Sequence, residues 1–193
     1  MTDISVIENN ILENYLIDDR AKTIDRFWDM FVIDALIANT DRHNSNWGFM
    51  EDLITHELKV APIYDCGSSL FPLLSDEEIG ELLKSEVDFK NPIHNVYSCL
   101  KVNNKRINYF TFLSDMQHDR CNAAVLRMYP SIDMENVLGI VNGINCISDD
   151  RRKFYCEALQ FRYEKMLTPV YQRLVKKEKE NDLNLEKDWS LKL

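Results

Sequence analysis

The chain has 193 residues, enough for one well-formed hydrophobic core but few for two independent domains. Hydrophobic residues make up 45% of it and charged residues 28%, as in soluble globular proteins. The formal net charge of −9 disfavours direct nucleic-acid binding, which needs a basic surface to displace counterions from phosphates. No apolar run approaches the roughly 20 residues of a membrane span, so we expect no membrane association.

The first element that the sequence predicts is a buried amphipathic helix over Thr23–Asn39. Apolar residues recur there at spacings of three and four, which is the period of one helix face. They are Ile24, Phe27, Trp28, Phe31, Val32, Ala35 and Leu36. A polar stretch over residues 39–46 follows. Two short strands, Trp47–Met50 and Leu58–Tyr64, then flank a polar turn at Glu51–Glu57.

The remainder of the chain is predicted to be helical. Ser75–Glu78 and Ser114–Gln117 both fit capping boxes, in which a hydroxyl and a carboxylate or amide satisfy exposed backbone donors. The helix that begins after the second box should end near Tyr129, because Pro130 does not continue it easily.

A long final helix is predicted to start at Ser148 and to bend at Pro169. One stripe of this helix is apolar, and core packing explains it better than a cofactor contact. The stripe consists of Tyr155, Leu159, Tyr163, Met166, Val170 and Leu174. We therefore expect one domain over residues 1–175, followed by a charged tail over residues 176–193 that is frayed or disordered in part.

Three oxygen-bearing side chains match the needs of phosphoryl transfer. Asp41 follows the buried helix, Asn46 comes five residues later, and Asp65 follows the second predicted strand. In protein kinases a base for the attacking hydroxyl and two oxygen ligands for Mg²⁺ occur in this order. The hairpin carries the chain out and back, so the three side chains can meet. Each position alone also fits a structural role, since Asp65 could close a strand and His43 could cap the helix.

Two segments carry a family resemblance. IANTDRHNSNWGFM (residues 37–50) and KVAPIYDCGSSLFP (residues 59–72) resemble the HipA family of toxin kinases. Asp41–Asn46 is also similar to the catalytic loop of the phosphoinositide 3- and 4-kinases, and residues 151–174 add weaker support. The resemblance covers roughly Ile24–Leu174. It implies a mainly α fold with a small β-hairpin, the C-terminal (large) lobe of a HipA-like, protein-kinase-like fold.

The resemblance also implies a role for each site residue. Asp41 would be the catalytic base, and His43 would lie near the transferred phosphoryl group, where an imidazole can steady developing charge. Asn46 and Asp65 would bind Mg²⁺ and, through it, ATP. Arg42 would brace the loop by a salt bridge. The implied reaction transfers the γ-phosphoryl group to a serine or threonine hydroxyl of a protein substrate, and the family implies a DNA-binding antitoxin as a partner.

Parts of a complete kinase are missing from the sequence. None of the five glycines forms a glycine-rich phosphate loop, and Lys22 is the only lysine before Asp41, so the N-terminal lobe is absent. Cys66 stands where many kinases have the phenylalanine of Asp-Phe-Gly, which puts activation by flipping in doubt. We expect little or no activity of the isolated chain. It would be a fragment, a split-gene product whose N-terminal lobe is a separate polypeptide, or a decayed kinase.

Two other classes of function stay open. His118 and Asp119 resemble the dipeptide of the metal-dependent HD phosphohydrolases, and His43, His56 and His94 could add ligands. A solvated pair at a helix start is the simpler interpretation of the dipeptide. The second alternative is a noncatalytic interaction module derived from a kinase lobe, which the missing N-terminal lobe favours.

The cysteines and the amino terminus bear on the compartment. The five cysteines are scattered and include no CxxC pair, so they predict neither a zinc site nor a disulfide framework. The amino terminus, MTDISVIENN, is acidic and polar, unlike a secretory signal. We therefore expect buried thiols in a reducing, cytoplasmic environment.

Overall fold

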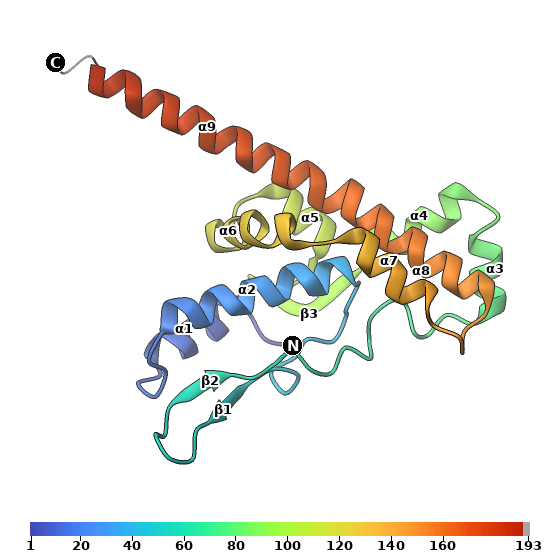
Figure 1. Ribbon diagram of the computed structural model, residues 1–193, viewed down its shortest axis with the longest axis horizontal. Helices are drawn as coiled ribbons and strands as arrows, with labels where there is room; N and C mark the ends of the chain where they lie inside the picture. Colours follow the sequence, from blue (N-terminus) through green and yellow to red (C-terminus); the bar gives the residue numbers. More distant parts are fainter. Residues whose placement is uncertain (191–193) are drawn as a thin grey trace.

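Helices dominate the architecture (Figure 1). The computed structural model describes the backbone of residues 1–190 and the side chains of residues 1–181 and 183. A 3₁₀ turn at Tyr129–Ser131 follows α6, and a π-helical turn at Tyr163–Leu167 joins α8 to α9. The helices are α1 (Ile4–Glu13), α2 (Arg20–Leu36), α3 (Asp76–Leu82), α4 (Glu86–His94), α5 (Tyr109–Asp115), α6 (Asp119–Met128), α7 (Met134–Asn142), α8 (Asp149–Arg162) and α9 (Thr168–Ser190).

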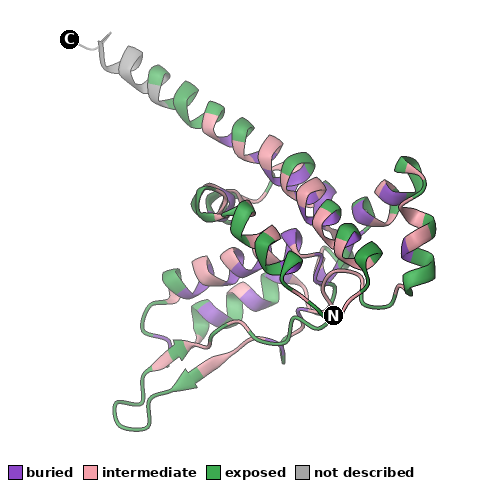
Figure 2. Cartoon of the chain, turned by 45° about the vertical axis from the view of Figure 1, so that its right-hand side comes forward, coloured by how far each residue is buried: buried purple, intermediate pink, exposed green. Residues whose placement is uncertain are grey.

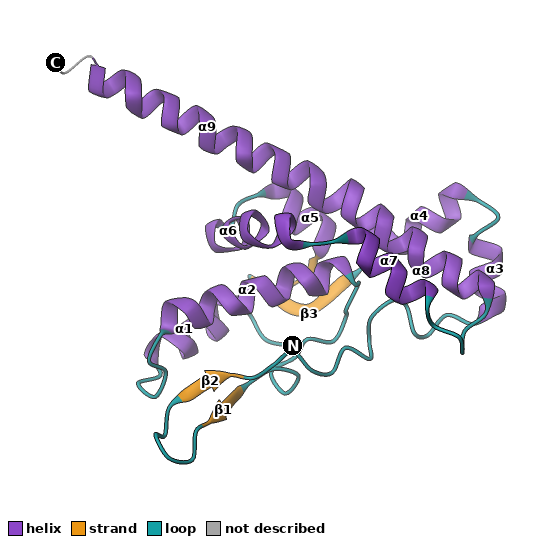
Figure 3. Cartoon of the chain, viewed as in Figure 1, coloured by secondary structure: helices purple, strands orange, loops and turns teal. Residues whose placement is uncertain are grey.

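Two small antiparallel hairpins complete the described part of the chain (Figure 3). In the first, β1 (Phe49–Glu51) pairs with β2 (Leu58–Val60). In the second, β3 (Tyr97–Val102) pairs with β4 (Lys105–Asn108), with an irregular register between Tyr97 and Lys101. The predicted class, mainly α with a small hairpin, is confirmed, and the second hairpin adds to it.

The main core forms around α2, which packs against α1, α6 and α8. Trp28 and Phe27 of α2 are fully buried and meet edge to face at 5.4 Å between ring centroids. Figure 2 shows buried residues along α2 and the inner part of α9, whereas the β1–β2 hairpin is exposed or half-buried. A smaller cluster between α3, α4 and α8 is formed by Ile79, Phe89, Ile93, Phe154 and Ala158. Packing of α2 on several helices therefore fixes the end from which the polar loop leaves.

Several predicted elements are present with shifted ends. The helix predicted over Thr23–Asn39 is α2, and the predicted strands are β1 and β2. The first capping box forms at Ser75 and Glu78, and α6 ends at Met128 as the following proline requires. Ser148 caps α8 by accepting a hydrogen bond from the backbone of Arg151.

Two predictions for the middle of the chain are wrong. The segment 97–108 is a hairpin and not helical, because Asn103 and Asn104 both adopt left-handed backbone angles that suit a two-residue turn. Ser114–Gln117 is no capping box: Ser114 lies in the last turn of α5, and α6 begins at Asp119 without a side-chain cap. The sequence also gave no prediction for α1.

The C-terminal part agrees with the predicted core stripe. Its four most buried members (Leu159, Met166, Val170 and Leu174) all belong to the main core. At Pro169, where the sequence predicts a bend, the structure has the π-helical turn directly before the proline. The predicted tail continues α9 to Ser190, and residues 191–193 lie outside the described part. None of the described helices is long and apolar enough to span a membrane.

Candidate active site

The polar loop begins directly after α2, where Asn39 is completely buried. Its side-chain oxygen accepts a hydrogen bond from the backbone N–H of Asp41 at 3.2 Å. Its amide nitrogen donates to a carboxylate oxygen of Asp34 at 2.8 Å. Ala38, just before it, has a left-handed φ of 57°, which turns the chain out of the helix. The buried Asn39 amide thus links the loop to α2.

Arg42 holds the loop from inside. All five N–H groups of its buried guanidinium have acceptors: Nε and Nη2 pair with the Asp34 carboxylate at 2.9 and 3.0 Å. Nη1 donates to the backbone oxygens of Asn46 and Tyr64, and Nη2 also contacts the Cys66 sulfur at 3.2 Å. Desolvation lowers the pKa of Arg42, but the hydrogen bonds and charge of Asp34 outweigh it and raise that pKa. The bracing role predicted for Arg42 is therefore present, with Asp34 as its partner.

Asp41, His43 and Asn46 lie together on this loop. The Asn46 side chain is buried, and its nitrogen donates to the backbone oxygen of Asp41 at 2.8 Å. His43 Nδ1 accepts from the Ser45 backbone at 3.2 Å, which leaves the proton of a neutral ring on Nε2. That nitrogen is 3.8 Å from an Asp41 carboxylate oxygen. Burial, with the Asp41 charge as the second cause, raises the pKa of the Cys99 thiol to about 11.

Asp65 is held at the edge of the same loop. The residues on both sides of it, Tyr64 and Cys66, contact the guanidinium of Arg42. The Tyr64 hydroxyl also donates to the Ser45 backbone oxygen at 3.1 Å. Asp65 itself is exposed and has a left-handed φ of 53°. The hairpin therefore returns the chain to the loop, as its predicted geometry requires.

The segment after Asp65 packs back onto the start of the loop. Thr40 donates its N–H to the Ser68 oxygen at 3.3 Å, and Leu70 donates its N–H to the Ile37 oxygen at 2.9 Å. Leu70 and Phe71 have left-handed φ angles of 55° and 59°, which cost energy for side chains of this size. Nothing in the sequence predicted this strained conformation, because neither residue type favours it.

Sequence reasoning missed three residues that shape the site. Asp34 carries a recognisable signal, since a carboxylate on the apolar face of a buried helix needs a partner. Asn39 belongs to the segment 37–50 that carries the family resemblance, but no role was predicted for it. Tyr109, whose hydroxyl donates to the Asn39 backbone oxygen at 2.7 Å, carries no local signal because it lies 70 residues away.

The residues that suggested a phosphohydrolase do not come together. His118 packs on the ring of Trp28 at 4.3 Å, and desolvation lowers its pKa. His56 pairs with Glu51 on an exposed turn, and His94 packs on Phe110 at 4.0 Å. Among the described residues, no three His, Cys, Asp or Glu side chains are placed to hold a metal ion. This result leaves the hydrolase alternative without a site there.

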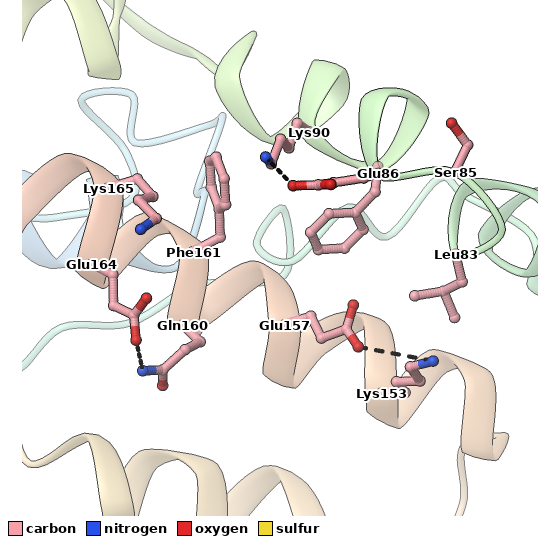
Figure 4. A pocket seen from close by; sticks show the side chains of 11 residues that line it. Leu83, Ser85, Glu86, Lys90, Lys153, Glu157, Gln160, Phe161, Glu164 and Lys165 are labelled. Carbon is pink, nitrogen blue, oxygen red and sulfur yellow. Dashed lines mark hydrogen bonds and ion pairs between the residues drawn. The ribbon is translucent and has the colours of Figure 1, made fainter.

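A groove of about 460 Å³ lies away from the loop, between α4 and α8 (Figure 4). Its floor includes Phe89 and Phe161. Two ion pairs line it, Glu86 with Lys90 and Glu157 with Lys153. None of the candidate site residues lines it, so the groove is separate from the loop.

Comparisons with known proteins agree with the resemblance in residues 37–50 and 59–72. The model of the HipA-like C-terminal domain matches residues 9–127. The serine/threonine-protein kinase CtkA of Helicobacter pylori strain J99 is 38% identical over 151 residues, which are 77% of this chain and 46% of that protein. The crystal structure of the H. pylori proinflammatory kinase CtkA matches with a TM-score of 0.86 at 34% identity, covering 91% of this chain and 60% of that one.

The chain spans about half the length of the curated relative that it matches. The segments that carried the resemblance lie within the matched residues 9–127, and these make up more than half of the chain. The chain belongs to the family of proteins with a HipA-like C-terminal domain.

Proposed function

We propose that this chain is the catalytic lobe of an ATP-dependent serine/threonine protein kinase. One observation carries the proposal: a single buried guanidinium, that of Arg42, contacts the loop at Asn46 and both neighbours of Asp65. The loop and the strand end that a kinase needs at one site are thereby held together. The relative CtkA is named a serine/threonine-protein kinase, which supports the same class of reaction.

Asn46 and Asp65 suit a magnesium ion chemically. Asn46 uses its side-chain nitrogen for the Asp41 backbone, and its side-chain oxygen has no hydrogen-bond partner among the described residues. Asp65 presents an exposed carboxylate that makes no ion pair within that part of the chain. Mg²⁺ commonly takes one or two protein oxygens and completes its shell with phosphate and water. When bound, the ion supplies positive charge that neutralises the phosphate oxygens of ATP.

In this proposal Asp41 acts on the acceptor hydroxyl. Its half-exposed carboxylate is open to a substrate, while the Asn46 amide and the Asn39 side chain fix its backbone on both sides. In this role the carboxylate orients a serine or threonine hydroxyl and accepts its proton. The Nε2 atom of His43 lies 3.8 Å from that carboxylate. In this role its N–H donates a hydrogen bond to the negative charge that develops on the transferred phosphoryl group.

The partners of the lobe follow from the parts that this chain does not provide. We propose that an N-terminal kinase lobe, on the same or a separate polypeptide, covers the nucleotide from the other side. A protein substrate then reaches Asp41 from solvent. A DNA-binding antitoxin and a cytoplasmic location stay predictions from the family and from the cysteine usage.

The test combines binding with transfer of labelled phosphate from ATP, with and without a supplied N-terminal lobe. With the lobe, we expect transfer that Asp41→Asn lowers by about 10²- to 10³-fold, the usual share of a general base. Asp41→Asn should leave binding of Mg²⁺–nucleotide nearly unchanged, whereas Asp65→Asn should weaken it. Asp18→Asn, at an exposed position outside the loop, is the matched control and should change neither quantity.

Two outcomes would contradict the proposal. Absence of Mg²⁺–nucleotide binding even with the N-terminal lobe would favour a noncatalytic interaction module. Transfer that survives Asp41→Asn unchanged would remove Asp41 from the mechanism.

A further inference from the structure

Tyr109 connects the candidate site to a part of the chain outside the family motifs. It is the first residue of α5, directly after β4, and it is completely buried. Its hydroxyl donates to the backbone oxygen of Asn39 at 2.7 Å, across 70 positions of sequence. Asn39 lies two residues before Asp41, so the contact reaches the base of the polar loop.

Asn39 links Tyr109 to the loop through three hydrogen bonds. Its backbone oxygen accepts from Tyr109, its side-chain nitrogen donates to Asp34, and its side-chain oxygen accepts from the Asp41 N–H. Asp34 in turn holds the guanidinium of Arg42. One buried residue therefore contacts the backbone of Asp41, the carboxylate that anchors Arg42 and the Tyr109 hydroxyl.

Tyr109 is itself held firmly. Its backbone N–H donates to the Val96 oxygen at 3.2 Å, and Asn108 caps α5 through the Thr111 N–H. The guanidinium of Arg162 lies 5.8 Å from the Tyr109 ring and donates to the backbone oxygens of Ala35 and Ile93. These contacts join the second hairpin, α2, α4 and α8 around one phenol ring.

We propose that Tyr109 is a positioning residue of the phosphoryl-transfer site, acting through Asn39 on the backbone of Asp41. The inference rests on the proposed function for its kinetic consequence, but its structural consequence can be measured separately. A phenylalanine at this position would keep the volume and leave the fully buried Asn39 oxygen without a donor. Burial raises the pKa of the Tyr109 hydroxyl, so it stays a donor throughout the physiological pH range.

The experiment compares Tyr109→Phe with Tyr129→Phe in the full chain. Tyr129 also loses a hydroxyl contact, 2.9 Å to Thr168, but at the junction of α6 and α9 and away from the loop. For Tyr109→Phe we expect about 10- to 100-fold lower kcat in the lobe-supplemented assay, with KM values for ATP and protein substrate changed less than about threefold. Tyr129→Phe should keep the wild-type kcat.

Hydrogen exchange gives a readout that does not need catalysis. In the chain alone, Tyr109→Phe should speed exchange of the amides from Asp41 to Asn46 by about tenfold, and Tyr129→Phe should not. If the wild type transfers no phosphate, the proposed function fails while exchange still decides the role of Tyr109. Wild-type exchange in Tyr109→Phe would overturn the inference, as would a kcat that matches the wild type.

Asn39→Ala provides a second route to the same answer. It leaves Tyr109 intact and removes both side-chain contacts through which the Tyr109 contact reaches the loop. We expect the same fall in kcat and the same faster exchange. Should Tyr109→Phe not fold, wild-type kcat and exchange in Asn39→Ala would overturn the inference, because the route from Tyr109 runs through Asn39.

Discussion

The two hairpins of this lobe have the same topology and opposite surroundings. The β1–β2 hairpin extends into solvent, and Leu53 and Ile54 at its turn are 86% and 90% exposed. The β3–β4 hairpin packs inward: Leu100 and Ile107 belong to the main core, and β3 contacts α1. The first hairpin lies between Asn46 and Asp65 in the sequence. The second hairpin leads into Tyr109, whose hydroxyl donates to the backbone oxygen of Asn39 at the start of the polar loop.

This difference separates two tasks that a site needs. A spacer has to return the chain to the same place, and its own exposed residues can vary with little energetic consequence. A support has to be rigid, and rigidity comes from burial and from polar contacts whose loss leaves unpaired groups. Substitutions should therefore affect the buried support much more than the exposed hairpin.

The largest effect is expected at Arg42, whose guanidinium joins the polar loop to the residues that follow the first hairpin. Arg42→Ala leaves the buried Asp34 carboxylate without its cation and should lower the free energy of unfolding by about 3–5 kcal/mol. Arg127→Ala is the matched control, because Arg127 forms its pairs with Asp25 and Asp29 in partly exposed surroundings. Its cost should stay below about 1 kcal/mol in the same urea titration. Equal costs for the two variants would show that the Asp34 pair is not effectively buried.

The next effect compares the hairpins directly. Ile107→Ala, at a buried position of β4, should cost about 2–4 kcal/mol through lost burial and the cavity it leaves. Ile54→Ala, at the exposed turn of the first hairpin, should change the free energy of unfolding by less than about 0.5 kcal/mol. Urea denaturation of both variants measures the contrast, and a large cost at Ile54 would contradict it.

The smallest effect concerns pH and the half-buried His118. Desolvation lowers the pKa of His118 in the folded state, and its Nδ1 is buried without a partner among the described residues. The unfolded chain then binds more protons, so stability is fully present above about pH 6.5 and falls as the pH drops through the folded pKa.

The measurement for His118 is the urea midpoint at pH 7.5 and at pH 5. His118→Gln should show a smaller fall between these pH values than the wild type. An unchanged fall in His118→Gln would assign the pH dependence to other groups.

The sequence predicted those features that depend on short separations along the chain. Asp41, Asn46 and Asp65 could be singled out because a helix, a loop and a hairpin occur in the order that a phosphoryl-transfer site needs. A bracing role for Arg42 was predicted, but its partner Asp34 required knowing that this carboxylate lies on the buried face of α2. The family was evident from the same segments.

Features that depend on tertiary packing or on strain escaped prediction. The contact from Tyr109 to Asn39 joins positions 70 residues apart, and neither residue type announces it. Leu70 and Phe71 adopt a backbone conformation that their side chains disfavour. The second hairpin is a different case, because Asn103 and Asn104 are suited to a tight turn and this local signal was available.

The saturated hydrogen bonding of Arg42 has a consequence for regulation. Many kinases are switched on when a phosphorylated side chain docks onto an arginine and orders the adjacent segment. Here every N–H of the loop arginine already has an acceptor within the lobe, and docking a phosphate would require breaking the pair with Asp34. A phosphoryl switch in this lobe would therefore need a different cation as its receptor.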